Sequence, residues 1–110
     1  MKPAPPRNDF ERRQAEVYDE ITRKLTGLIP AHWNSAQLDM RAAGDDLALS
    51  IFNFDGEVEV VEPSLELFEA GMKLVRLYEG TNCEWSRAEY AVSRETGSEA
   101  WREHVKFRYV

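Results

Sequence analysis

The segment from Leu47 to Glu62 constrains the fold of this chain more than any other. Its sequence, LALSIFNFDGEVEVVE, alternates apolar residues with small or charged ones on both sides of Asp55-Gly56. Alternation with a period of two is typical of a half-buried strand. Asp-Gly between two such runs favours a type I′ turn, because both central residues of that turn need a positive φ. The segment therefore predicts a β-hairpin whose two arms belong to an antiparallel sheet.

The two faces of this predicted hairpin differ in character. Phe52 and Phe54 share one face with Glu57 and Glu59, and aliphatic residues occupy the other face. The aliphatic face suits a hydrophobic core. Aromatic side chains framed by carboxylates, on the face turned away from the core, suggest a recognition surface. A third layer of structure or a second copy of the chain would also cover the two phenylalanines, so both interpretations stay open.

Negative charge is concentrated around this hairpin. Between Arg41 and Lys73 the chain has eight carboxylates and no Lys, Arg or His, whereas the net charge of all 110 residues is −6. The rest of the chain is therefore net positive. An acidic run can be a solvated surface that keeps a protein soluble, or a recognition surface for a basic partner. The candidate partner-binding residues are these carboxylates and the two phenylalanines: Asp45, Asp46, Phe52, Phe54, Asp55, Glu57, Glu59, Glu62, Glu66 and Glu69.

The residues before the hairpin predict a helix and a first strand. After a possible cap at Asn8 or Asp9, apolar residues recur at helical spacing from Phe10 to Leu28, and Pro30 ends the helix. Residues 33–41 alternate between apolar and polar side chains and predict a strand. Residues 43–46 provide the turn into the hairpin, so the three strands should form a meander with residues 47–54 at its centre.

The residues after the hairpin predict a second helix and a second hairpin. Ser64 can cap a helix that ends near Gly80, and two adjacent apolar stripes suggest packing on more than one side. Only Glu66, Glu69, Lys73 and Arg76 are expected to face water. From residue 83 to residue 110, alternating aromatic and aliphatic residues around a turn at 95–98 predict two closing strands.

The predicted fold is a single α+β domain over residues 9–110, with the element order α-β-β-β-α-β-β. An antiparallel sheet of about five strands should carry two helices on one face. Residues 1–8 are expected to form a flexible, proline-rich lead-in that lacks the apolar region of a secretory signal. No segment approaches the ~18 apolar residues of a membrane span.

No residue pattern predicts catalysis, a metal site or a cofactor. His32 and His104 lie far apart, and neither belongs to a metal-binding spacing. Glu57 and Glu59 form a possible acid–base pair, but an open sheet surface lacks the desolvation that shifts a pKa. Cys83 is the only cysteine, so we expect a packed thiol in a reducing cytoplasm.

Several local patterns resemble the YezG-like family of immunity proteins. The similar segments are VYDEI at 17–21, LIPAHW at 28–33, the predicted meander that follows, and VKFRY at 105–109. Members of this family are cytoplasmic antitoxins encoded beside polymorphic toxins and related contact-dependent effectors. The resemblance implies no catalytic residues, and it assigns Trp33 and the aromatic residues of the last strand to packing.

The function implied by the resemblance agrees with the charge distribution. Many toxin domains of such systems are nucleases, whose active surfaces are basic because they bind phosphates. An immunity protein can place carboxylates where those phosphates would lie. We therefore expect a cytoplasmic monomer or homodimer that binds a basic toxin domain and has no direct nucleic-acid or membrane partner. The alternative is a small acidic secretion chaperone for an effector protein.

Overall fold

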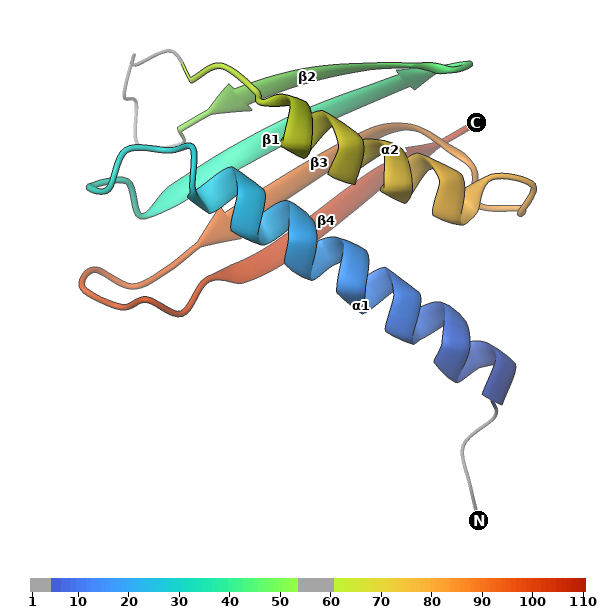
Figure 1. Ribbon diagram of the computed structural model, residues 1–110, viewed down its shortest axis with the longest axis horizontal. Coiled ribbons are helices and arrows are strands. Elements are labelled where there is room, and N and C mark those ends of the chain that lie inside the picture. Colours follow the sequence, from blue (N-terminus) through green and yellow to red (C-terminus); the bar gives the residue numbers. More distant parts are fainter. Residues whose placement is uncertain (1–4, 54–60) are drawn as a thin grey trace.

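A computed structural model of the protein describes residues 5–53 and 61–110. The described elements are α1 (Pro5–Thr26), β1 (Ser35–Ala43), β2 (Asp46–Phe52), α2 (Leu65–Tyr78), β3 (Trp85–Ser93) and β4 (Arg102–Tyr109). The four strands pair antiparallel in the order β2-β1-β3-β4, and both helices lie on one face of this sheet (Figure 1). The predicted α+β class and the two-helix layer are confirmed. Within the described ranges the sheet has four strands rather than about five.

The first helix begins earlier than the sequence predicted. Its first residue is Pro5 rather than Phe10, so residues 5–8 belong to the helix and not to a lead-in. Proline suits the first turn of a helix. Its fixed φ is already helical, and the N–H that it lacks would have no acceptor within the helix at this position.

The strand predicted to be central, β2, lies at an edge of the described sheet. β1 pairs with β2 on one side, where Leu38 is opposite Ile51, and with β3 on the other, where Leu38 is opposite Tyr90. The reversal of the chain between β1 and β2 occurs at Gly44, which has a φ of +61°. The predicted Asp55-Gly56 turn lies outside the described residues. Residues 61–64, at the end of the expected second arm, are not in a strand.

One hydrophobic core fills the space between the sheet and the two helices. Alternate residues of β1 and β3 project into it, and the inward faces of both helices close it from above. Gly71 is where α2 comes closest to the sheet: an added Cβ would lie 2.8 Å from Leu47 Cδ2. The fully buried side chains of this core include Ile21, Leu25, Trp33, Leu38, Met40, Leu67, Leu74, Tyr90 and Val92.

Three tyrosines connect the helices to the sheet. The Tyr90 hydroxyl donates to the carbonyl oxygen of Tyr18 at 2.7 Å and lies 2.6 Å from the Thr22 hydroxyl. The Tyr78 hydroxyl accepts a hydrogen bond from the Gln14 side chain. Burial raises the pKa of all three phenols above the ordinary value, because a phenolate loses more solvation than a phenol when it is buried.

The predicted closing hairpin is confirmed as β3 and β4. Its turn contains Gly97, which has a φ of +84°. The register of the pair shifts between Trp85 and Arg87, and Trp85 is buried against Phe107. Cys83 is exposed in the α2–β3 connection, so the prediction of a packed thiol is wrong. No helix in the described part of the chain is long and apolar enough to cross a bilayer.

Candidate functional site

Six of the ten residues predicted to bind a partner lie in the described part of the chain, and these six do not form one surface. The other four, Phe54, Asp55, Glu57 and Glu59, lie outside the described residues. The six are found in three places: on and before α2, at the β1–β2 turn, and on the far face of the sheet.

The carboxylates nearest α2 are all exposed. Ser64 caps this helix, since its side-chain oxygen accepts from the Leu67 N–H at 3.1 Å. Glu66 lies in the first turn, where a negative charge complements the positive end of the helix dipole. Glu69 lies one turn later, and Glu62 precedes the cap; all three carboxylates face solvent. The cap therefore fixes the orientation of this acidic group.

An apolar flank of α2 lies beside these carboxylates. Leu65 is 69% exposed, and Phe68 and Met72 are only partly buried. The expectation that only charged residues of this helix face water is wrong. The core covers the stripe centred on Leu67 and Leu74, whereas the adjacent stripe packs against the core only in part. Phe68 and Met72 line a shallow hollow of about 430 Å³, whose other lining residues carry charges of both signs: Glu20, Glu69, Lys73 and Arg76.

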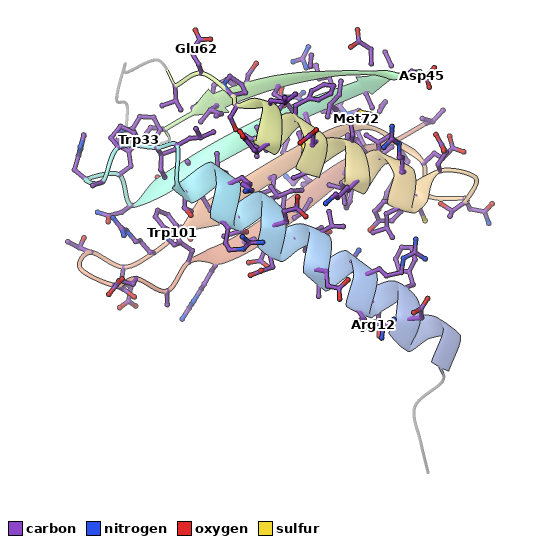
Figure 2. The ribbon with its side chains drawn as sticks, viewed as in Figure 1. Arg12, Trp33, Asp45, Glu62, Met72 and Trp101 are labelled. Atoms are coloured by element: carbon purple, nitrogen blue, oxygen red, sulfur yellow. The ribbon has the colours of Figure 1, made fainter. Side chains whose placement is uncertain are left out.

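Asp45 and Asp46 lie at the start of β2, whereas Glu62 lies beyond the end of this strand, before α2. Figure 2 shows Glu62 near the start of α2 and Asp45 at the other end of β2. The seven residues of β2 separate the two ends, and a strand of that length spans roughly 20 Å. The described carboxylates of this run therefore lie in two groups, Glu62, Glu66 and Glu69 at α2 and Asp45 and Asp46 at the β1–β2 turn. We name these five residues the acidic edge.

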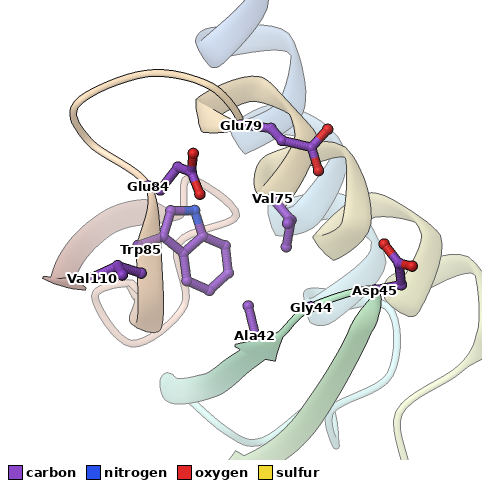
Figure 3. Close-up of a pocket in the computed structure, with 8 residues that line it drawn as sticks. All are labelled: Ala42, Gly44, Asp45, Val75, Glu79, Glu84, Trp85 and Val110. Atoms are coloured by element: carbon purple, nitrogen blue, oxygen red, sulfur yellow. The ribbon is translucent and has the colours of Figure 1, made fainter.

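A hollow beside Asp45 adds two carboxylates that the sequence did not indicate. Glu79, at the end of α2, and Glu84, before β3, line this space of about 240 Å³ together with Asp45 (Figure 3). Val75 and Trp85 contribute apolar walls. Glu84 is held in place because its carboxylate accepts from the Gly80 N–H at 2.9 Å. No sequence signal predicts this hollow, because its residues come from parts of the chain that are far apart in sequence: the end of β1 and its turn, the end of α2, the start of β3 and the last residue.

Phe52 lies on the sheet face opposite the helices, as predicted, and is 46% exposed. It is opposite Gln37 in the β1–β2 register, on the same face as Asp39 and Arg41. The α2 carboxylates lie on the helical side of the molecule. Phe52 therefore belongs to a different surface from Glu62, Glu66 and Glu69, whereas its predicted combination with Glu57 and Glu59 lies outside the described residues.

The side chains of the acidic edge and of the apolar flank of α2 are suited to binding a partner through charge and apolar contact. Among the described residues, no group of three His, Cys, Asp or Glu side chains is placed to hold a metal ion. His104 is exposed on β4, as predicted. Exposed carboxylates beside half-buried aliphatic and aromatic side chains form a surface that can attract a cationic partner and then exclude water from the contact.

No protein-family model matches this chain, and no curated protein matches it significantly. The sequence and the geometry of the described residues are therefore the basis for any functional conclusion.

Proposed function

We propose that this protein is an immunity protein that binds and neutralises one cognate toxin domain with a basic surface. The observation that carries this proposal is the arrangement on α2, where exposed carboxylates adjoin the exposed Leu65 and the half-buried Phe68 and Met72. The resemblance to YezG-like proteins and the concentration of negative charge between residues 42 and 72 support the same conclusion.

The carboxylates and the apolar flank have separate tasks in such a complex. Glu62, Glu66 and Glu69 speed association with a basic surface through long-range attraction. Leu65 and Phe68 slow dissociation, because apolar side chains that become buried on binding provide much of the binding energy. If the toxin is a nuclease, the carboxylates occupy the places of its substrate's phosphates.

A pull-down from lysate of the native organism, at low and high salt, tests the proposal. The wild-type protein should retain one basic protein in stoichiometric amount and release it at high salt. Glu66→Lys with Glu69→Lys should weaken that binding by roughly tenfold or more, since each reversal replaces an attraction with a repulsion. Expression of the retained protein should stop bacterial growth, and co-expression of the wild-type immunity protein should restore it.

The matched control reverses two carboxylates away from α2. Glu95→Lys with Glu99→Lys makes the same change in net charge on the exposed β3–β4 connection. This variant should bind and protect as the wild type does. Equal losses in both variants would show that only net charge matters, and a retained protein without toxicity would refute the immunity function.

The alternative function is a secretion chaperone, which is favoured by one observation. The apolar flank of α2 and the hollow lined by Phe68 and Met72 could hold an extended effector segment. Such binding would persist at high salt and would survive the Glu66→Lys, Glu69→Lys change. It would be lost instead on Leu65→Ser with Phe68→Ser.

A further inference from the structure

The sheet face opposite the helices is covered by no described element, and its character is opposite to that of the acidic edge (Figure 1). The register of the strands places Arg41 of β1 opposite Arg87 of β3, and Arg87 opposite Arg108 of β4. Three guanidinium groups therefore form a row across three adjacent strands, whose spacing is about 4.8 Å. We name this set, Arg41, Arg87 and Arg108, the arginine row.

Like charges on directly opposed residues destabilise a sheet, so the arginine row has a cost to folding. Asp39 offsets part of it: its carboxylate lies 2.8 Å from Arg87 Nε and 3.2 Å from Arg41 Nε. These two arginines cover Asp39 so completely that it is only 4% exposed, although it points away from the core. Glu89 adds a longer contact with Arg87, at 3.6 Å.

The β4 end of this face is compensated only in part: Glu89 lies opposite Lys106 in the register, whereas Arg108 lies opposite Arg87. Arg108 and its neighbour on the same face, Lys106, are both exposed. Neither forms an ion pair with any residue of the described ranges. On the central rows of this face the cations Arg41, Arg87, Lys106 and Arg108 outnumber the carboxylates Asp39 and Glu89. A chain of net charge −6 thus has one face with excess positive charge.

The rest of the face combines small side chains with Gln37 and His104, and it ends in an exposed aromatic. Ala48 and Ser50 of β2 and Ala91 of β3 provide only small side chains beside the charged rows. Phe52, at the end of β2, is 46% exposed on the same face. A partner can therefore approach the sheet closely between a cationic edge at β4 and an apolar anchor at β2.

We propose that this uncovered sheet face is a second interaction surface, which docks an acidic surface of a partner protein. Carboxylates of the partner pair with Lys106 and the arginine row, and an apolar side chain of the partner covers Phe52. The overall charge of −6 disfavours nucleic acid as the partner of this face. A polyanion with a charge at every nucleotide is repelled by the acidic edge at long range, whereas a few carboxylates pair locally.

A titration of the ¹⁵N-labelled full-length protein with a short peptide, in which a few glutamates are spaced by glycine and serine, tests this proposal at low salt. Amide signals of β1, β3 and β4 around the arginine row should shift, and the shifts should disappear at high salt. Lys106→Glu with Arg108→Glu should weaken the binding at least about tenfold. These two side chains are exposed and outside the described ion pairs, so the far-ultraviolet circular dichroism should not change.

Arg12→Glu with Arg23→Glu is the matched control, because it makes the same charge change on the exposed surface of α1. This control should bind the peptide as the wild type does. Absence of binding at low salt, or shifts confined to α1, would overturn the proposal. Tighter binding of an oligothymidylate of equal length would assign the face to nucleic acid instead. Self-association that buries Phe52, detected by sedimentation, would assign it to a second copy of the chain.

Discussion

At the scale of single residues, Gly71 determines how closely α2 approaches the sheet. A Cβ at this position would lie 2.8 Å from Leu47 Cδ2 and 3.4 Å from Met40 Sδ. Gly71→Ala should therefore lower the free energy of unfolding by about 1–3 kcal/mol, because overpacking a core forces side chains to shift. Alanine's helix propensity, better by about 1 kcal/mol, offsets only part of this cost. Urea denaturation followed by circular dichroism measures the difference.

A double-mutant cycle distinguishes this clash from other effects of the substitution. Leu47→Ala removes the atom that the new Cβ would meet. In that background Gly71→Ala should be neutral or stabilising, because the helix propensity gain remains and the vacated space accepts the methyl group. An equal loss of stability in both backgrounds would contradict the explanation. The sequence placed Gly71 on an apolar stripe of the second helix, but the identity of its neighbour depends on the tertiary packing.

At the scale of elements, local signals in the sequence predicted the helices and the closing hairpin well. Ser64 and Gly80 bracket α2, and the turn at residues 95–98 separates β3 from β4. These features depend on a few adjacent residues, so they can be predicted from sequence alone. The order of the strands could not, because β3 reaches β1 only after α2 has crossed the sheet. Alternation in β1 is equally compatible with an edge and a central position.

For the candidate site, too, the features that depend on local sequence were predicted, and those that depend on long-range structure were not. The orientation of Glu66 and Glu69 follows from helix periodicity and was predicted correctly as exposed. Asp45 and Glu62 belong to the same acidic run in the sequence, but they are far apart in space because the strand β2 separates them. The arginine row was missed because its three members come from three strands. Its recognition requires the inter-strand register.

The two ends of the first helix, α1, are packed against the rest of the protein to different extents. Phe10 packs edge-to-face on Tyr78, with ring centroids 5.5 Å apart, whereas Ile21 is fully buried in the core. Phe10→Ala should loosen the first two turns of α1 and cost only about 1 kcal/mol, since the contact is a partly buried aromatic pair. Ile21→Ala should cost about 2–5 kcal/mol and destabilise the whole domain.

Hydrogen exchange distinguishes these two outcomes for α1. In Phe10→Ala the amides of residues 9–14 should exchange faster while those of β1 and β3 keep their protection. In Ile21→Ala the protection of the strands should fall together with that of the helix. Uniform acceleration in Phe10→Ala would show that the start of α1 is not a separate unit of stability.

At the scale of the whole molecule, two surfaces of opposite charge lie on opposite sides of one sheet. The acidic edge follows α2 and the β1–β2 turn, and the arginine row lies on the face without helices. The core between them is apolar and well packed, so binding at one surface need not disturb the other. Tyr18, Tyr78 and Tyr90, which join α1, α2 and β3, are titratable groups at the contacts between these elements.

These tyrosines make the stability of the fold sensitive to alkaline pH. Burial raises the pKa of Tyr18, Tyr78 and Tyr90 above the unfolded value of about 10. Below that pH the phenols are neutral in both states, so their contribution is fully present. Above it the unfolded chain loses protons that the folded protein keeps. Stability should then fall with rising pH by at most about 1.4 kcal/mol per pH unit for each tyrosine, until the folded pKa is reached.

Chemical denaturation at a series of pH values measures this slope. Tyrosinate absorbance, followed in a Tyr109→Phe background that leaves only Tyr18, Tyr78 and Tyr90, shows whether ionisation accompanies unfolding. Tyr90→Phe should make the slope shallower by about one third, because one of the three raised groups is removed. At neutral pH the same variant should lose about 1–3 kcal/mol, since the Thr22 hydroxyl loses its partner in the interior. A constant stability from pH 10 upward, or tyrosinate absorbance that rises before the circular dichroism changes, would show that the tyrosines ionise within the folded protein. If stability falls above pH 10, and tyrosinate absorbance rises together with the loss of circular dichroism, then α1, α2 and β3 unfold as one cooperative unit.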